Sequence, residues 1–299
     1  MFDIPGSDNF KNILPLDKGY SGDKKYYIET SDARRLLLRV SDIKEYDRRK
    51  TMFEMMTQLA PLNLPMPQPL DFGTCDGGKS VYQLLSWCDG EDLEKILPTL
   101  SESEQYAVGL EFGRILKKVH SLGAPDTLDD WFLRYTAQND ARVNAFAKTG
   151  IEIEGSDVLL RYYTENKGLL RNRPQCFQHG DSHIGNLLLD KQKKLSVIDW
   201  EIISYENYGD PWEEFNRINH SEIVPHFHSA QIAGYFDGEP PEDFWKLLAL
   251  YLSAGALMIV VWAHHLQPNE LEYAIQNVSN VLSWFDNMNA LVPSWYVRN

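Results

Sequence analysis

Three polar residues near the middle of the chain have types and spacing that could support chemistry. Asp181 ends a His-Gly-Asp triplet, Asn186 follows five residues later, and Asp199 follows thirteen residues after that. The residues between Asn186 and Asp199 are apolar, then polar, then apolar again, which predicts a hairpin. A four-residue loop at 191–194 would place Asn186 opposite Asp199 across the ladder.

Amide and carboxylate oxygens are ligands that Mg²⁺ prefers, so Asn186 and Asp199 are candidate metal ligands. Asp181 would lie in the loop before the hairpin, where a carboxylate can orient or accept a hydroxyl proton. A loop Asp, an Asn five residues later and a following metal-binding Asp are the parts of the protein-kinase catalytic loop. The segment therefore predicts metal-assisted phosphoryl transfer.

The elements around this segment predict an α+β chain of two lobes. Residues 12–40 and 81–87 have strand patterns, and a helix is expected over about 43–60 with Ser41 or Asp42 as its N-cap. After residue 87 the pattern becomes helical. Helices are expected at 101–121, where Ser101 and Glu104 resemble a capping box, and at about 156–169, 211–219, 241–265 and 268–287. We predict a small antiparallel β lobe, 1–87, and a larger, mainly helical lobe, 88–299.

The charge balance disfavours nucleic acid and anionic membranes as partners. The chain has 299 residues and a formal net charge of -14, whereas phosphate-binding surfaces need clustered Lys and Arg. Between residues 199 and 243 there are eleven carboxylates and a single Arg. This segment either attracts a cationic small molecule or is a solvated acidic face, and the sequence leaves both interpretations open.

Other features favour a protein of the cytoplasm. The three cysteines are far apart, which argues against a disulfide framework, and the first residues lack a secretory pattern. The apolar segment 247–263 is short for a membrane span, and we expect a buried helix. Five histidines lack metal-ligand spacing; they are His220, His226, His228, His264 and His265.

Two short matches to nucleotide motifs are expected to be turn chemistry. Residues 73–80 fit the phosphate-loop pattern G-x4-G-K-S, but a strand pattern follows where that motif requires a helix. Residues 71–73 spell Asp-Phe-Gly, but this triplet precedes the catalytic segment instead of following it. We predict a hairpin turn around residues 75–78.

The chain resembles the aminoglycoside phosphotransferases and their relatives, the choline and other small-molecule kinases with a protein-kinase-like fold. The resemblance covers nearly the full length. The segments that carry it are LDKGYSGDKKYYIE, LLSWCDGEDL, ILKKVHS, HGDSHIGNLLL, VIDWE and GDPWEE. The combination HGDxxxxN with IDWE is the most specific of these marks.

The resemblance implies a set of site residues. Asp181 would be the catalytic Asp, with Asn186 and Asp199 holding Mg²⁺. Nucleotide would be bound by a loop over the phosphates, by a hinge, by the strand residue Arg39 and by an acid on the following helix. These residues are Gly19, Tyr20, Ser21, Gly22, Arg39, Glu54, Ser86 and Cys88, with Trp87 between the last two. His179 would brace the loop, Gly209 and Asp210 would anchor the segment after Asp199, and the acceptor would contact Glu201, Asp210 and Glu213.

Arg39 departs from the family pattern, because Lys usually occupies this strand position. Arg keeps the positive charge but differs in reach and geometry. Its expected acidic partner on the following helix is Glu54 or Glu45, and the sequence does not decide which.

The predicted activity is transfer of the γ-phosphoryl group of ATP to a hydroxyl of a small, cationic molecule such as an aminoglycoside. A kinase for choline or another metabolite alcohol is an alternative, since Trp200, Trp212 and Tyr205 could form an aromatic cage. A nucleotide-binding pseudokinase is a second alternative, against which the intact Asp181, Asn186 and Asp199 argue. The chain lacks the A-P-E element of protein kinases.

Overall fold

The computed structural model describes residues 3–16, 22–200, 207–220 and 224–298, which form two compact units. The sheet unit comprises Met1–Leu93 and Asn186–Ile202, and the helical unit comprises Glu94–Gly185 and Ile203–Asn299. The chain therefore returns to the sheet unit for one hairpin after its first pass through the helical unit. The predicted boundary between lobes, after residue 87, does not include this second segment of the sheet unit. The predicted α+β fold is confirmed.

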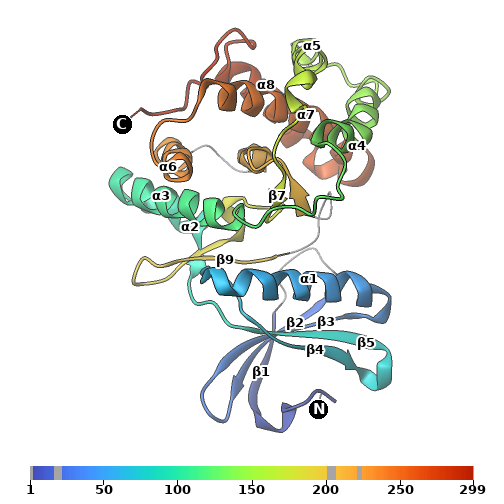
Figure 1. Ribbon diagram of the computed structural model, residues 1–299, viewed down its shortest axis with the longest axis vertical. Helices are drawn as coiled ribbons and strands as arrows, with labels where there is room; N and C mark the ends of the chain where they lie inside the picture. Colours follow the sequence, from blue (N-terminus) through green and yellow to red (C-terminus); the bar gives the residue numbers. More distant parts are fainter. Residues whose placement is uncertain (1–2, 17–21, 201–206, 221–223, 299) are drawn as a thin grey trace. The chain divides into compact units, whose positions relative to one another are not determined.

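The sheet unit is built on a five-stranded antiparallel sheet with the order β1-β2-β3-β5-β4. Its strands are β1 (Phe10–Leu16), β2 (Lys24–Thr30), β3 (Arg35–Asp42), β4 (Pro69–Cys75) and β5 (Ser80–Ser86). Helix α1 (Tyr46–Leu59) packs along β4 and β5 (Figure 1). Alternation along β3 sends Leu36, Leu38 and Val40 into an apolar cluster on one face. Arg39 therefore points to the other face.

The segment that matches the phosphate-loop pattern is a hairpin, as predicted. Residues 76–78 form a tight turn between β4 and β5, and the Asp-Phe-Gly triplet lies within β4. The amides of Asp76 and Gly77 donate to the carboxylate of Asp3 at 2.6 Å and 2.9 Å. These turn amides are therefore already bonded to a carboxylate of the chain.

The hairpin that carries two of the candidate site residues has a different register from the predicted one. It consists of β8 (Leu187–Leu189) and β9 (Leu195–Val197), and β6 (Glu91–Asp92) extends it to three strands. Leu189 pairs with Leu195, because the turn closes over three residues with Lys193 at a φ of 62°. Asn186 consequently aligns with Ile198, whose amide donates to the Asn186 carbonyl at 2.9 Å. The predicted pairing of Asn186 with Asp199 was wrong by one residue.

In its described part, the helical unit contains seven helices of eight residues or more, and a two-stranded sheet. They are α3 (Glu102–Val119), α4 (Trp131–Phe146), α5 (Ser156–Asn166), α6 (Pro225–Phe236), α7 (Glu242–Leu266), α8 (Leu271–Trp284) and the 3₁₀ helix η9 (Glu213–His220). Strands β7 (Cys176–Phe177) and β10 (Tyr208–Gly209) pair antiparallel. The four-residue helix α2 (Leu93–Ile96) begins at the boundary between the units. The capping box of Ser101 and Glu104 is confirmed at the start of α3.

Helix α7 is the core of the helical unit. It packs against α4, α5, α8 and η9. It is long and apolar enough to cross a membrane, but 78% of its most apolar 18-residue window is buried inside the protein. A core helix covered on every side has this composition, as the sequence led us to expect for residues 247–263.

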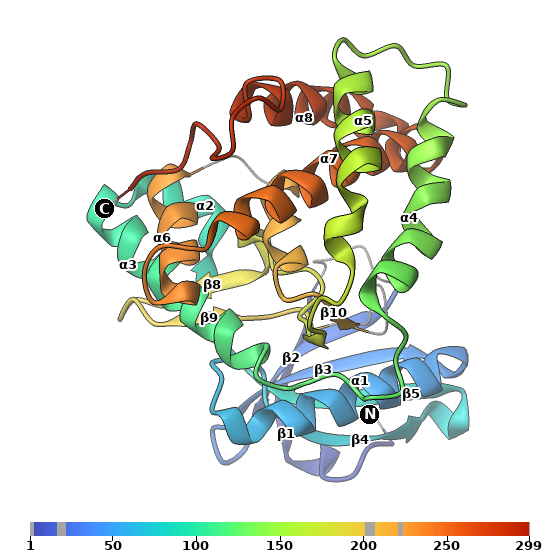
Figure 2. The ribbon, with the colours of Figure 1, turned by 45° about the horizontal axis from the view of Figure 1, so that its top comes forward.

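Helices α3 and α6 lie side by side and approach closely (Figure 2). A Cβ atom at Gly113 of α3 would lie 2.0 Å from the carbonyl oxygen of Gln231 on α6, so only glycine allows this approach. The crossing sets the position of His120, which follows the end of α3. Helices α4 and α6 were not predicted, and the predicted helix at 211–219 is the 3₁₀ helix η9.

Candidate active site

Asp181 lies in a loop of the helical unit that leaves β7 and turns sharply at Gly180. Gly180 has a φ of +85°, which a side chain rarely adopts, and an added Cβ would lie 3.3 Å from the Asn207 amide oxygen. The Asp181 amide donates to Nδ1 of His179 at 3.2 Å. Its carboxylate is about one-third exposed and lies 3.5 Å from Nε2 of His183. The loop therefore presents the carboxylate with one face accessible.

The electrostatic surroundings keep the Asp181 carboxylate ionised. Burial raises its pKa, but the hydrogen bond and the positive charge of His183 lower it further than burial raises it. Arg217 and His179 add smaller effects in the same direction, so the pKa lies well below its usual range. An ionised carboxylate accepts hydrogen bonds only, which is the form that can orient or accept a hydroxyl proton.

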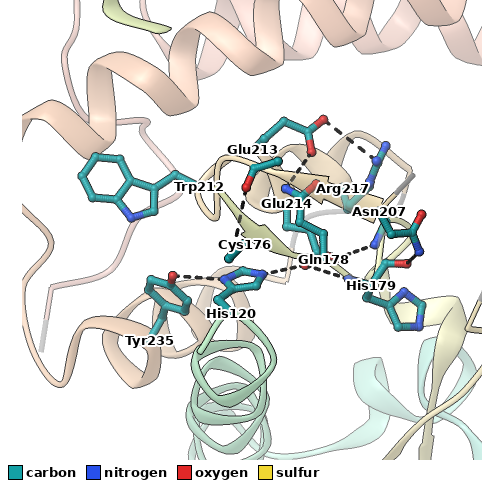
Figure 3. Close-up of polar contacts among 12 residues, drawn as sticks. His120, Cys176, Gln178, His179, Asn207, Trp212, Glu213, Glu214, Arg217 and Tyr235 are labelled. Atoms are coloured by element: carbon teal, nitrogen blue, oxygen red, sulfur yellow. Dashed lines mark hydrogen bonds and ion pairs between the residues drawn. The ribbon is translucent and has the colours of Figure 1, made fainter. Parts of the chain in front are cut away.

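A buried carboxylate braces this loop from the opposite side. Glu214, on η9, accepts hydrogen bonds from the amides of Gly180 at 2.9 Å and His179 at 3.2 Å. It also lies 2.7 Å from Nε2 of His120, whose Nδ1 lies 3.0 Å from the Tyr235 hydroxyl. Figure 3 shows this row of contacts running from α6 to the loop. Glu214 thus fixes the backbone on which Asp181 sits.

The surroundings of Glu214 favour its charged form. Burial raises the pKa of Glu214, but the hydrogen bond and charge of His120 outweigh burial and bring the pKa down to about 2. Sequence reasoning assigned the bracing role to His179 alone and missed Glu214 and His120. The GDPWEE and ILKKVHS segments that contain them were the available signals.

Asp210 does not have the predicted acceptor-binding role. Its side chain is fully buried and paired with Arg173, whose Nε lies 2.7 Å and whose second nitrogen lies 3.0 Å from the carboxylate. The Tyr251 hydroxyl donates to the same carboxylate at 2.8 Å, and the Trp212 amide donates at 3.0 Å. Asp210 therefore anchors the segment that follows β10, which is the other role that the resemblance implied.

Glu213 is also too buried to contact an acceptor directly. It accepts hydrogen bonds from the side chain of Asn216 at 3.0 Å and from Gln178 at 3.4 Å. Burial raises the pKa of Glu213 above its usual value. The third predicted acceptor residue, Glu201, lies outside the described residues.

Several carboxylates between residues 199 and 243 are not part of an exposed acidic face. Asp210, Glu213 and Glu214 are buried and bonded within the protein. Asp237 pairs with Lys117, and Lys246 lies within ion-pair distance of both Glu242 and Asp243. The predicted aromatic cage is not available either: Trp200 is buried, the ring of Trp212 is covered by the Arg173 guanidinium at 3.9 Å, and Tyr205 is outside the described residues.

Asn186 and Asp199 lie at the same end of the β8–β9 hairpin in the sheet unit. Asp199 follows the residue that bonds to the Asn186 backbone, and its φ of 61° turns the chain out of the ladder. Asp tolerates this conformation better than most residues. Both residues offer hard oxygen donors, and the Asp199 side chain remains partly exposed. This donor set fits a magnesium ion.

Arg39 has a different acidic partner from those predicted. Its Nε lies 2.7 Å from the carboxylate of Asp23, which also binds Arg49 of α1. Glu54 is 58% exposed and lies 3.9 Å from Lys50, while Glu45 pairs with Arg48. Asp23 therefore has the position beside Arg39 that was predicted for Glu54 or Glu45, and the role of Glu54 at the nucleotide site stays a prediction. Arg39 also lies 3.6 Å from Asp199.

The predicted nucleotide loop and hinge are only partly described. Gly19, Tyr20 and Ser21 lie outside the described residues, and Gly22 is exposed. In the hinge, the Ser86 amide donates to Gln68 at 2.9 Å and the Trp87 amide donates to Arg35 at 3.1 Å. These two amides are already used within the sheet unit. The contact of Cys88 with adenine stays a prediction.

The chain belongs to the phosphotransferase enzyme family. The model of this family, abbreviated APH, matches residues 12–245, which include every predicted site residue. No curated protein sequence matches the chain significantly. The family identifies the protein as a small-molecule phosphotransferase and confirms the resemblance on which the site residues were assigned.

Solved structures share the fold at low sequence identity. A choline/ethanolamine kinase family protein from Mesorhizobium loti has a TM-score of 0.67 and 15% identity, over 97% of this chain and 94% of that one. A thermostable mutant of the aminoglycoside phosphotransferase APH(4)-Ia has a TM-score of 0.64 and 17% identity, over 93% and 96%. APH(2")-IIa in a ternary complex with streptomycin and ATP has a TM-score of 0.62 and 16% identity, over 92% and 93%.

Proposed function

We propose that this protein transfers the γ-phosphoryl group of ATP to a hydroxyl group of a small molecule, with Mg²⁺ as the metal. The observation that carries the proposal is the partly exposed Asp181 carboxylate on a loop that Glu214 braces, followed in the chain by the oxygen donors Asn186 and Asp199. Family membership supports the reaction class. The similar fold of a kinase solved with ATP supports the choice of nucleotide.

Each group has a defined task in this reaction. Asn186 and Asp199 would hold Mg²⁺, which when bound neutralises charge on the nucleotide phosphates. Asp181 accepts a hydrogen bond from the acceptor hydroxyl and takes its proton as the oxygen attacks the γ-phosphorus. The bond from the γ-phosphorus to the bridging oxygen breaks, and ADP leaves with that electron pair. Glu214 keeps Asp181 in place throughout.

For the acceptor, we propose an amine-bearing molecule such as an aminoglycoside. The net charge of -14 supports a cationic acceptor, since a negative protein attracts it at long range. Of the three acceptor residues that the resemblance implied, Glu201 is the one that the described contacts do not already engage, and it lies outside the described residues.

The test is transfer of labelled phosphate from ATP to a panel of aminoglycosides, choline and neutral sugars. Each amine should be paired with its N-acetylated form, which keeps the hydroxyl groups and removes the charge. The proposal predicts a phosphate ester with the free amine, and a KM that rises with ionic strength for the amine alone. Equal turnover of both members of every pair would refute the cationic acceptor. Absence of transfer to any hydroxyl compound would refute the activity.

We also propose that the protein works in a reducing compartment such as the cytoplasm. Cys75, Cys88 and Cys176 are all free thiols, and reduced thiols persist where glutathione and thioredoxin are active. Fractionation of the native host would test this assignment, and recovery in a secreted fraction would contradict it.

A further inference from the structure

Two cations of the sheet unit approach the same carboxylate from neighbouring strands. Lys25 of β2 is the direct register partner of Arg39 of β3, so both side chains lie on the same face of the sheet. Nζ of Lys25 lies 3.8 Å from the Asp199 carboxylate, and a terminal nitrogen of Arg39 lies 3.6 Å from it. The residue at the usual Lys position is therefore accompanied by a lysine one strand away.

The two cations differ in how firmly they are held. Arg39 is 7% exposed, and its Nε is bound at 2.7 Å by Asp23, a carboxylate that is itself 6% exposed. Lys25 is 15% exposed, and its contact with Asp199 is longer than a hydrogen bond. An ammonium group at this distance can reach another oxygen without giving up a short bond.

A second arginine makes the position of Arg39 still more fixed. Arg49 of α1 binds the same oxygen of Asp23, and its Nε donates to the Ser41 hydroxyl at 3.1 Å. The Arg49 carbonyl accepts a hydrogen bond from Gln83 of β5 at 3.2 Å. Withdrawing Arg39 from Asp23 would separate a buried ion pair, which is costly. The Asp23–Arg39–Arg49 triad therefore behaves as part of the framework.

We propose that Lys25 is the side chain that contacts the nucleotide phosphates, and that Arg39 is a positioning residue held by Asp23 and Arg49. This inference rests on the proposed ATP-dependent activity and adds a residue role to the same site. A lysine ammonium is a compact point charge with three donors, which suits a phosphate oxygen. Asp199, the proposed metal ligand, places Lys25 beside the phosphates that the metal would bind.

The experiment compares four variants with the wild-type protein. Lys25→Met removes the charge and keeps the chain length, and Lys25→Arg restores a charge. Lys24→Met is the matched control, since Lys24 is adjacent but exposed on the opposite face of β2. Arg39→Lys removes the guanidinium group whose Nε lies 2.7 Å from Asp23 while it keeps a cation. For each protein, calorimetry gives the Kd of Mg-ADP and of adenosine, and melting gives Tm.

The proposal predicts a loss that is specific to phosphate. Lys25→Met should weaken Mg-ADP binding roughly 10- to 100-fold, the scale of one hydrogen bond to a charged group. Its affinity for adenosine and its Tm should match those of Lys24→Met, which should behave as wild type. Lys25→Arg should recover part of the Mg-ADP affinity. Arg39→Lys should lower Tm and weaken Mg-ADP binding less than Lys25→Met does.

Three results would overturn the proposal. Lys25→Met could bind Mg-ADP as well as Lys24→Met does, or it could lose adenosine and Mg-ADP binding equally together with a lower Tm, which would indicate a structural role. Arg39→Lys could weaken Mg-ADP binding more than Lys25→Met at an unchanged Tm. If the wild-type protein bound no nucleotide, the proposed function would fail as well. Wild-type binding with an unaffected Lys25→Met would refute the lysine assignment alone.

Discussion

The catalytic loop of the helical unit and the cation cluster of the sheet unit hold their charged groups by different means. In the loop, the buried Glu214 binds two backbone amides and His120 (Figure 3). In the cation cluster, Asp23 binds the side chains of Arg39 and Arg49. The first arrangement fixes the backbone itself, whereas the second fixes side-chain ends and leaves Lys25 less constrained.

This difference has a functional meaning. A group that must meet a hydroxyl oxygen in a defined geometry gains from a rigid backbone, because small displacements of a catalytic group reduce the rate strongly. A cation that contacts phosphate groups gains more from a long side chain than from a rigid backbone. Changes at the loop should therefore affect kcat and stability, and changes in the sheet unit should affect nucleotide binding.

The largest effect is expected for Asp199→Ala. This variant removes an oxygen donor of the proposed metal site and the shared carboxylate of Lys25 and Arg39. Turnover should fall on the order of 10³-fold or more, as when a group that stabilises transition-state charge is lost, and Mg²⁺-nucleotide affinity should fall with it. The control is Asp190→Ala in the turn of the same hairpin, where the carboxylate caps the turn amides of Gln192 and Lys194. Normal turnover by Asp199→Ala would remove the metal assignment.

Glu214→Gln should be the most destabilising change among the residues that brace the Asp181 loop. The amide keeps the size of the side chain but replaces one acceptor oxygen with a donor that faces other donors. The free energy of unfolding should fall by roughly 3 kcal/mol, the scale for breaking a buried charged pair. Urea denaturation at neutral pH measures this change. A difference below about 1 kcal/mol would mean that Glu214 does not hold the loop.

The pH dependence of the free energy of unfolding should show that Glu214 is charged in the folded protein. Its pKa is about 2 in the folded protein against an ordinary value of 4.5. Because this pKa is lower in the folded protein, the charged Glu214 contributes its full stabilisation at pH values above the pKa of the unfolded state. The contribution is lost as the pH falls toward the pKa of the folded state. The stability gap between wild type and Glu214→Gln should narrow by about 2 kcal/mol between pH 7 and pH 3. A gap that stays constant over this range would contradict the assignment.

Glu213→Gln should have the smallest effect, although the two glutamates are adjacent. Burial raises the pKa of Glu213 in the folded protein, so folding disfavours its charged form above the unfolded pKa. A neutral amide therefore loses little, and the free energy of unfolding at pH 7 should change by less than about 1 kcal/mol. A loss equal to that of Glu214→Gln, measured in the same urea titration, would erase the distinction between the two residues.

Local signals in the sequence predicted much of the fold and the loop. The capping box of Ser101, the turn at residues 76–78 and the hairpin after Asn186 depend on neighbouring residues, and the structure contains all three. The register of that hairpin depends on one backbone angle at Lys193, and a three-residue turn shifts every pair by one position. Sequence patterns do not determine such an angle when the residue is not glycine.

The contacts that sequence could not supply are those between distant segments. Asp23 meets Arg49 across 26 positions, and His120 meets Glu214 across 94. Helix α6 contains Gly234, a weak helix former, and it is stabilised by close packing on α3. The number of carboxylates between residues 199 and 243 suggested an acidic face, because a count of charges does not show that acids such as Asp210 and Glu213 are buried. In each case tertiary packing decided the outcome.

The measurement that tests the account most directly is calorimetric titration of Mg-ATP into Asp181→Asn, together with its turnover on the same preparation. The change preserves size and removes the charge and basicity of the proposed base. We predict that kcat falls roughly 10²- to 10⁴-fold, the range for loss of a general base, while the Kd for Mg-ATP stays close to that of wild type. Asp126→Asn, at an exposed acid of the same unit, should change neither value. If Asp181→Asn instead lost Mg-ATP binding as severely as Asp199→Ala, Asp181 would belong to the metal site, and the division of roles between the loop and the sheet unit would be wrong.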